Sequence, residues 1–420
     1  AGVHPRRMRC AMPVFTVFTA LFCLGAAIIR GLVTETGYRR VDDPEVIARA
    51  ASLSGLSGDR VGRAFAAKAS LFNPFTHEKE KSVAYLRLAV AEILGEGKLV
   101  LTGFSSHLVP AAIAHVLRIC LVAEMSHRLR QAESGPAPDK DASKAIHRSD
   151  EDRSAWTLLL HGKADPWDPL LYDIVIPTDK IAAEESVHLI VRNLHSDVLT
   201  PTPASLAALA DFQLQARVQV ALTLEGHEVS VAVQDGAVNL TIEKNVLMLS
   251  RLEQELQEIV AKVPGVRSVT TGVGANFHQA DIYRKVEFQA PSRVLLVDDE
   301  REFVQTLSER LLLRDMGSAV AYDGESALEM LREDEPEVMI LDLKMPGIDG
   351  MEVLRQVKAT QPDIEVIILT GHGNETDRET CMGLGAFAYL QKPVDIDVLS
   401  ETMKRANEKI EARKQAQQGA

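Results

Sequence analysis

The sequence Val338-Met-Ile-Leu-Asp-Leu-Lys-Met-Pro-Gly-Ile-Asp-Gly350 combines an apolar run, an acidic residue and a turn. Four apolar residues lead directly into Asp342, and Pro346, Gly347 and Gly350 mark the turn that follows. A short, unbroken apolar run is typical of a strand that is buried on both faces of a parallel sheet. A carboxylate at the C-terminal end of such a strand lies at the edge where open α/β sheets bind ligands. Asp342 is therefore either a cap on the next element or a reactive group.

Three further apolar runs end in polar residues. These are Asp298 and Asp299 after the run that begins at 293, Thr370 after the run that begins at 364, and Lys392 after the run that begins at 387. Because parallel strands end at one edge of a sheet, we expect these side chains to gather around Asp342. Clustered carboxylates repel one another unless a hard cation binds them, and oxygen ligands suit Mg²⁺. A carboxylate beside Mg²⁺ can attack a phosphoryl group, so the sequence predicts a phosphoacceptor.

Residues from about Arg293 to Ala406 resemble the receiver domain of two-component response regulators along their whole length. The resemblance assigns Asp298 and Asp299 as the acid pair for Mg²⁺, Asp342 as phosphoacceptor and further metal ligand, Lys344 as a metal ligand through its backbone carbonyl, Thr370 as switch hydroxyl, Tyr389 as switch aromatic, and Lys392 as catalytic lysine. It implies a flavodoxin-like (βα)5 fold for a domain over 293–410, Mg²⁺ as cofactor and a sensor histidine kinase as phosphodonor. The alternative is a set of acids that only cap helices.

The composition is that of a soluble globular protein with more than one domain. The chain has 420 residues, of which 46% are hydrophobic and 25% charged, so extensive cores are expected. A net charge of −13 argues against broad non-specific nucleic-acid binding, and no helix-turn-helix segment is recognisable, so we expect no DNA partner. The four cysteines show no paired spacing, which favours reduced thiols and a cytoplasmic location.

A charge-free run from Cys10 to Ile29 follows a cluster of arginines near the N-terminus. It is long enough to span a bilayer or to act as a signal peptide. Pro13 and its threonines disfavour a membrane helix, and we expect instead the first strand and loop of a parallel α/β domain. Membrane contact of residues 10–29 stays open at this stage.

Strand and helix patterns alternate over residues 12–198, which predicts a parallel sheet with helices on both faces. Three phrases in this region resemble the cytidylate-kinase-like branch of P-loop nucleotide kinases. They are Tyr38-Arg-Arg-Val-Asp42, Asp150-Glu-Asp-Arg153 and Trp167-Asp-Pro-Leu-Leu-Tyr-Asp-Ile-Val-Ile-Pro-Thr-Asp179. The resemblance implies a P-loop-kinase-like fold and a nucleotide ligand for this domain.

The phosphate-binding loop of that family is not recognisable here. A phosphate cradle needs several glycines, a lysine and a Mg²⁺-binding hydroxyl, whereas Cys23–Ile29 offers only Gly25. Such contacts supply most of the catalysis in phosphoryl transfer, so we interpret the domain as a degenerate, pseudokinase-like one. Gly25, Arg128 and Arg153 are the candidate nucleotide- or anion-binding residues. The alternatives are helix charges that face solvent and, for the whole domain, an active cytidylate kinase regulated by phosphorylation.

Pro201 and Pro203 mark a linker, after which residues 205–288 read as helix, two strands, helix and strand. The phrases Val233–Val238 and Pro264–Val269 resemble those of BON domains, which implies a lipid or protein partner. With the receiver-like region, the chain is thus interpreted as a multidomain α/β response regulator. It would accept a phosphoryl group on Asp342 and relay the signal to its N-terminal domains, or, alternatively, act as a BON-mediated membrane- or partner-binding adaptor.

Overall fold

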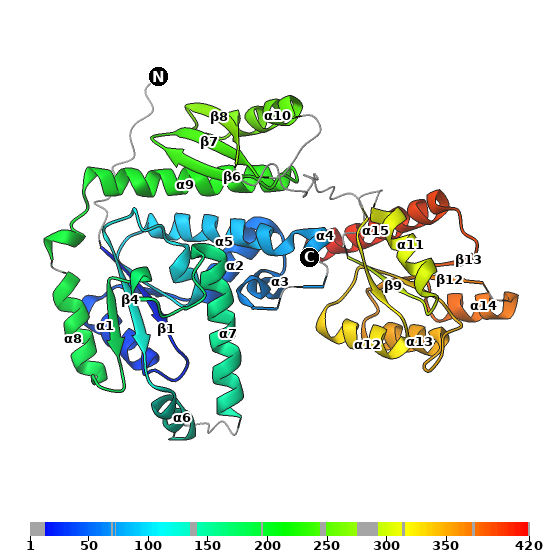
Figure 1. Ribbon diagram of the computed structural model, residues 1–420, viewed down its shortest axis with the longest axis horizontal. Coiled ribbons are helices and arrows are strands. Elements are labelled where there is room, and N and C mark those ends of the chain that lie inside the picture. The colour runs from blue at the N-terminus through cyan, green and yellow to red at the C-terminus, as the bar shows by residue number, and fades with distance from the viewer. Residues whose placement is uncertain are drawn as a thin grey trace. The chain divides into compact units, whose positions relative to one another are not determined.

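The computed structural model describes residues 13–68, 70–71, 73–134, 141–194, 196–243, 249–274, 293–312, 316–371 and 374–418. It divides into two compact units. One comprises residues up to Ala69 together with Lys79–Tyr283, and the other comprises Ser70–Glu78 together with Arg284–Ala420. Each unit is described by itself, the C-terminal one first (Figure 1).

The C-terminal unit contains a five-stranded sheet in the order β10-β9-β11-β12-β13, and every neighbouring pair is parallel. Its strands are β9 (Val294–Val297), β10 (Ser318–Ala321), β11 (Val338–Leu341), β12 (Glu365–Thr370) and β13 (Ala388–Gln391). The sequence order reverses between β9 and β11, which is where doubly wound sheets bind ligands. The predicted five-stranded flavodoxin-like sheet is confirmed.

Helices alternate with these strands along the chain, and apolar side chains form a core on each face of the sheet. The helices are α11 (Arg301–Leu312), α12 (Gly324–Glu333), α13 (Gly350–Thr360), α14 (Glu375–Gly383) and α15 (Ile396–Gln418). Asp349 caps α13, with its side chain accepting a hydrogen bond from the Glu352 amide. A Cβ atom at Gly350 would lie 1.9 Å from the Asp342 carbonyl oxygen, so only glycine fits directly behind that acid.

The same unit includes α4 (Asn73–Thr76) and the residues just before it. The backbone amide of Leu71 donates to the Asp334 carboxylate over 3.0 Å, and the Ser70 hydroxyl also donates to that carboxylate. Leu71 packs against the core that contains β11.

The N-terminal unit contains a second parallel sheet of five strands in the order β2-β3-β1-β4-β5, as the alternating pattern predicted. Its strands are β1 (Val14–Thr19), β2 (Arg39–Val41), β3 (Leu99–Thr102), β4 (Val116–Val122) and β5 (Ile174–Pro177). The helices that precede the linker are α1 (Gly25–Thr36), α2 (Asp43–Ser54), α3 (Gly58–Gly62), α5 (Glu78–Leu94), α6 (Met125–Ser134), α7 (Ala142–His161) and α8 (Ala183–Leu194).

The two faces of this sheet are covered differently. Side chains of α1 and α8 form one core with β1, β4 and β5, and α1 and α8 pack against each other. Side chains of α5 form the core on the other face. The 20-residue helix α7 was not predicted from the sequence, because Asp150-Glu-Asp-Arg153 within it was interpreted only as a phrase that resembles the kinase family.

The remaining part of the N-terminal unit follows the predicted order of helix, two strands, helix and strand. It consists of α9 (Pro203–Leu224), β6 (Ser230–Gln234), β7 (Ala237–Ile242), α10 (Leu249–Ala261) and β8 (Ser268–Val273). β6 and β7 pair antiparallel, and β7 and β8 pair parallel. Figure 1 shows α9 running between this small sheet and α5.

Helix α9 contributes side chains to two cores. Phe212 and Ala216 join the core that contains α5, whereas Leu214 and Val218 join the core of the small sheet. A helix that packs on opposite sides has apolar residues all around it and lacks the one-sided stripe of a surface helix. The small sheet is therefore connected to the five-stranded sheet of the same unit by a shared helix.

The structure also bears on the apolar N-terminal run. Residues 13–29 of it form β1, a short loop and the beginning of α1, while residues 10–12 lie outside the described residues. Over the described part of the chain, the helices are all too short or too polar to cross a bilayer.

Candidate functional site

Three acidic side chains meet at the C-terminal edge of the sheet in the C-terminal unit. Asp298 follows β9 and Asp342 follows β11, and each is 5% exposed, whereas Asp299 is exposed to solvent. One carboxylate oxygen of each residue lies within 4.8 Å of the others. Because β9 and β11 are adjacent and in register, their terminal acids come together without any special loop conformation.

Lys392 holds the two buried acids together. Its Nζ lies 2.6 Å from Asp298 Oδ2 and 3.4 Å from Asp342 Oδ2. Burial alone would lower the pKa of Lys392, but its ion pairs with Asp298 and Glu300 raise that pKa above the ordinary value. Burial also raises the pKa of Asp298, although the lysine and the Glu300 amide counteract this effect. The lysine thus neutralises part of the negative charge at this edge.

The structure places the other predicted residues around this cluster. Thr370 ends β12 and is fully buried, and its backbone carbonyl accepts a hydrogen bond from the Lys392 amide over 2.9 Å. Tyr389 lies on β13 opposite Ile368, and its hydroxyl is buried without a hydrogen-bond partner among the described residues. Burial raises the pKa of Tyr389. The Lys344 amide lies 3.5 Å from Asp342 Oδ1, and the proposed role of the Lys344 carbonyl stays a prediction.

Two neighbours of Lys392 were missed in the sequence. Glu300 Oε1 lies 2.9 Å from Lys392 Nζ, and the Phe303 ring lies beneath the same ammonium group, with 4.3 Å between Nζ and the ring centroid. The signal for Glu300 was present, since it is the third acid of the run 298–300. The signal for Phe303 was not, because a single aromatic residue in the first turn of α11 is indistinguishable from an ordinary core residue.

The donor set at this edge fits a divalent cation. All three groups are carboxylates, the hard oxygen donors that Mg²⁺ prefers, and one of them is open to solvent. Lys392 pairs with Asp298 and Asp342, and Asp299 lies beside them, so the three carboxylates keep a net negative charge that a cation would balance. Asp298, Asp299 and Asp342 are therefore the residues that would hold Mg²⁺.

A different arrangement occupies the loop after β1 in the N-terminal unit. Two backbone carbonyls at this loop accept from arginines: Arg153 Nε donates to the Thr19 carbonyl over 3.0 Å and Arg128 Nε to the Leu21 carbonyl over 2.9 Å. Phe22 and Leu24 adopt positive φ angles of 62° and 55°. A phosphate-binding loop uses glycine at such positions and turns its N–H groups toward the ligand.

The three candidate anion-binding residues all have protein neighbours in this loop. Arg128 also forms a bidentate ion pair with Asp150, with N–O distances of 2.7 and 2.8 Å, and it is buried. Arg153 also donates to the Ser149 carbonyl over 2.8 Å. A Cβ atom at Gly25 would lie 2.7 Å from Thr19 Oγ1, which gives this glycine a packing reason to be there. Anion binding by Gly25, Arg128 and Arg153 stays a prediction.

The doubly wound sheet with an acid cluster and a lysine at its C-terminal edge defines the class of the C-terminal unit, a receiver-type α/β fold. Residues 294–404 match the family model described as response regulator receiver domain, and residues 14–180 match the cytidylate kinase-like family. The chain therefore combines an N-terminal cytidylate kinase-like domain with a C-terminal receiver domain.

Relatives match the receiver part. The response regulator MprA of Mycobacterium ulcerans is 36% identical over 112 residues, which are 27% of this chain and 48% of that protein. The C4-dicarboxylate transport transcriptional regulatory protein DctD of Pseudomonas aeruginosa is 38% identical over 121 residues, 29% of this chain and 26% of that protein. A crystal structure of a response regulator receiver domain protein from Clostridium thermocellum is 36% identical, covers 28% of this chain and 94% of that chain, and has a TM-score of 0.27. The chain spans about half the length, or less, of these curated relatives.

Proposed function

We propose that this protein is a two-component response regulator that accepts a phosphoryl group on Asp342 from a sensor histidine kinase. The observation that carries the proposal is the convergence of Asp298, Asp299 and Asp342 with Lys392 at one sheet edge. The receiver-domain match over 294–404 supports it independently.

Asp342 is the nucleophile in this proposal. Its carboxylate oxygen attacks the phosphorus atom as the bond from phosphorus to the donor breaks, which produces an aspartyl phosphate. Bound Mg²⁺ supplies charge neutralisation for the phosphoryl oxygens. Lys392 Nζ is already 3.4 Å from Asp342 Oδ2, so it is positioned to pair with a phosphoryl oxygen when it leaves Asp298. Asp298 and Asp299, together with Asp342, would hold the Mg²⁺.

Thr370 and Tyr389 transmit the change in this proposal. A new phosphate beside Lys392 offers oxygen acceptors to the Thr370 hydroxyl at the end of β12. Movement of Thr370 frees space toward which Tyr389 turns, and its hydroxyl, unpaired among the described residues, gains a partner. Since β12 and β13 are adjacent, the surface near them is the element that the phosphate biases.

The N-terminal domains are the proposed output. We infer that the cytidylate kinase-like domain does not transfer phosphoryl groups, because the segment Cys23–Ile29 after β1 has one glycine and no lysine. The small sheet around β7 is proposed to bind a lipid surface or a partner protein, as its BON-like phrases imply. Domain limits of 12–198, 205–288 and 293–410 are part of the same proposal.

Incubation of the purified chain with radiolabelled acetyl phosphate and Mg²⁺ tests the acceptor. The wild type should incorporate label that is stable in acid and labile in base, as expected of an acyl phosphate, and Asp342→Asn should incorporate none. Asp363→Asn is the matched control, because Asp363 is an exposed acid of the same unit that pairs with Arg413. Label retained by Asp342→Asn would refute the assignment.

A further inference from the structure

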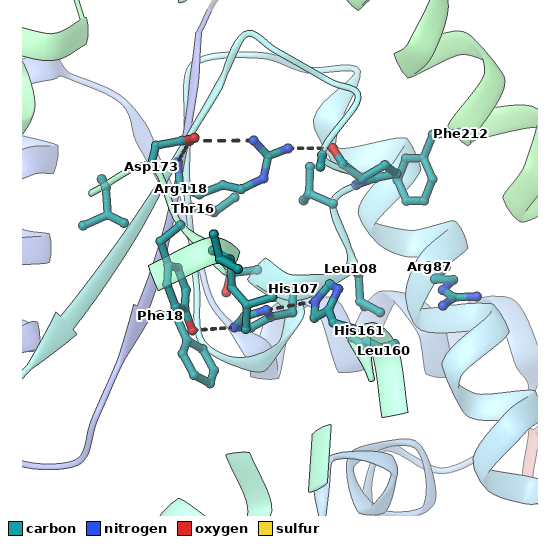
Figure 2. Close-up of a pocket in the computed structure, with 18 of the residues that line it drawn as sticks. Thr16, Phe18, Arg87, His107, Leu108, Arg118, Leu160, His161, Asp173 and Phe212 are labelled. Carbon is teal, nitrogen blue, oxygen red and sulfur yellow. Dashed lines mark hydrogen bonds and ion pairs between the residues drawn. The ribbon is translucent and has the colours of Figure 1, made fainter. Parts of the chain in front are cut away.

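A cavity of about 580 Å³ lies in the N-terminal unit on the sheet face opposite α1 and α8. It is bounded by β1 and β4, by α5, by the end of α7 and by α9. Figure 2 shows side chains from these separate segments pointing into one space. The volume is in the range that holds a small organic ligand. The loop after β1, residues 20–25, takes no part in its lining.

Two arginines line this cavity, and only one of them is neutralised. Arg118 Nη2 donates to the Pro110 carbonyl over 2.6 Å, and Arg118 Nη1 lies 3.7 Å from Asp173 Oδ2 (Figure 2). Arg87, on α5, forms neither a hydrogen bond nor an ion pair with any described residue. It is partly buried, and burial lowers the pKa of Arg87. A partly buried cation without a counter-charge costs folding free energy, which an anion in the cavity would offset.

A histidine pair forms the second polar feature of the cavity. Tyr172 donates its hydroxyl hydrogen to the Pro166 carbonyl, so it accepts a hydrogen bond from His107 Nε2, 3.2 Å away. His107 Nδ1 is then an acceptor, and it receives the hydrogen of His161 Nε2 over 3.2 Å. Both rings are neutral in this chain of hydrogen bonds, in agreement with the lowered pKa values of both histidines, for which burial is the main cause. His161 Nδ1 is left as a hydrogen-bond acceptor.

The apolar wall of the cavity is built from well-buried rings. Phe18 on β1 is 2% exposed and Phe212 on α9 is 4% exposed. Tyr172 lies nearly parallel to Phe18, with 6.3 Å between the ring centroids. Gln215 and Gln219 add amide groups from α9. The cavity thus combines one unmatched cation, one free acceptor and aromatic surface, the usual composition of a small-molecule site.

We propose that this cavity binds a small organic anion whose phosphate or carboxylate pairs with Arg87 and whose apolar part lies against Phe18 and Phe212. A hydroxyl or amino group on the ligand would donate to His161 Nδ1. This site is separate from the receiver, and it does not depend on phosphorylation of Asp342. It makes the kinase-like domain a ligand sensor, and α9, which lines the cavity, connects the ligand to the small sheet around β7.

Calorimetric titration of the full chain with phenyl phosphate, benzoate, benzyl alcohol and inorganic phosphate tests the proposal. We expect one aromatic anion to bind at one site per chain, with affinity reduced about ten-fold or more in Arg87→Met. Benzyl alcohol, the neutral analogue, should bind to the wild type no more tightly than the aromatic anion binds to Arg87→Met. Tighter binding of phenyl phosphate than of benzoate identifies a phosphate ligand, and the reverse order identifies a carboxylate.

Arg30→Met is the matched control, since Arg30 is an exposed arginine on α1, on the other face of the same sheet. Arg87→Lys should retain part of the affinity because it retains the charge. Thermal unfolding of each variant without ligand checks that it folds. The proposal is overturned if neither aromatic anion saturates a site below about 10 mM, if Arg87→Met binds like the wild type, or if inorganic phosphate binds as tightly as phenyl phosphate.

Discussion

The described residues form two five-stranded parallel sheets, one in each unit. The side chains just past the C-terminal ends of their strands differ in how their charges are balanced. At the edge of the receiver sheet, Lys392 pairs with Asp298 and Asp342, and Asp299 lies beside these two acids, so negative charge is left over. At the loop after β1 in the kinase-like domain, Arg128 is matched by Asp150 and by a backbone carbonyl. The first edge keeps a net negative charge, whereas the arginine at the second is paired with an acid.

This difference shows that the residues that build the fold are not the residues that determine which ligand the sheet edge can bind. Both sheets are built by short apolar strands and alternating helices, and both are of a type that binds ligands at the strand ends. What separates them is a small set of side chains just past those ends. Phe22 and Leu24 stand where a phosphate cradle needs glycine, whereas the receiver has glycine at position 350, where a close approach to Asp342 requires it.

Phosphoryl transfer by the kinase-like domain would contradict this difference most directly. We expect the purified chain, given ATP, Mg²⁺ and CMP or dCMP, to release ADP at the rate of a sample without the second nucleotide. The reason is that the loop after β1 has one glycine and no lysine, so it lacks the cation that stabilises a transferring phosphate. Turnover well above that background, measured in a coupled ADP assay, would show that the loop rearranges into an active form.

The next largest effect is expected at the receiver edge. Asp298→Asn should lower the rate of labelling by acetyl phosphate about 100-fold, because it removes one of the two buried carboxylates near Lys392. Chelation of the metal with EDTA should have a similar effect on the wild type. The rate is measured by quenched-flow sampling of acid-stable label.

Glu300→Gln is the control for that variant. It also removes an acid within reach of Lys392, but Glu300 lies on the exposed side of the cluster. We expect a decrease of about three-fold or less, since an exposed ion pair contributes little. An equal loss in both variants would mean that charge near the lysine matters and that Asp298 is not a specific metal ligand.

The receiver site was predictable from the sequence because of how parallel strands are built. Asp298, Asp342 and Lys392 each follow a short apolar run, and the ends of such runs share an edge once the strands pair in register. The five-stranded flavodoxin-like fold followed from the resemblance to receiver domains. The prediction needed no knowledge of side-chain contacts, and so it placed Asp298, Asp342 and Lys392 together correctly.

The sites of the kinase-like domain were not predictable in this way. Arg128 and Asp150 lie on different helices, and only packing of α6 against α7 brings them together. The cavity beside Arg87 is assembled from five or more separate segments, none of which carries a recognisable motif. Sequence patterns report periodicity and local turns, whereas such pairings depend on tertiary structure.

Arg128 is either a structural residue or an anion ligand, and stability measurements distinguish the two roles. If it is structural, Arg128→Met should lower the free energy of unfolding of the N-terminal unit by about 2 kcal/mol or more, because Asp150 and the Leu21 carbonyl lose their partner. Denaturant titration followed by tryptophan fluorescence measures it, since both tryptophans, Trp156 and Trp167, belong to this unit.

Arg130→Met on the same helix serves as the control, because Arg130 is exposed, and we expect a change of about 0.5 kcal/mol or less. If Arg128→Met kept full stability but lost binding of inorganic phosphate, the arginine would be an anion ligand. Both sheets would then bind a ligand at the C-terminal ends of their strands.

The smallest predicted effect is a pH dependence that belongs to the kinase-like domain. Burial, with a smaller contribution from His161, lowers the pKa of His107 to about 3 from its ordinary 6.5. Between these two pH values, His107 binds a proton in the unfolded chain but not in the folded chain. The contribution of neutral His107 to the free energy of unfolding is therefore fully present above pH 6.5 and is lost as the pH falls. The slope is about 1.4 kcal/mol per pH unit, which gives roughly 2 kcal/mol between pH 6.5 and pH 5.

His107→Gln should remove most of that acid sensitivity, because glutamine stays neutral and can still hydrogen-bond to Tyr172. His188→Gln is the matched control in the same unit, since the His188 side chain is 74% exposed. The measurement is the denaturant midpoint of the tryptophan-monitored transition at pH 7.5 and pH 5. Equal acid sensitivity in the wild type and His107→Gln would mean that the histidine pair opens to solvent in solution. The hydrogen bonds from His161 to His107 and from His107 to Tyr172, which line the cavity beside Arg87, would then not be maintained in solution.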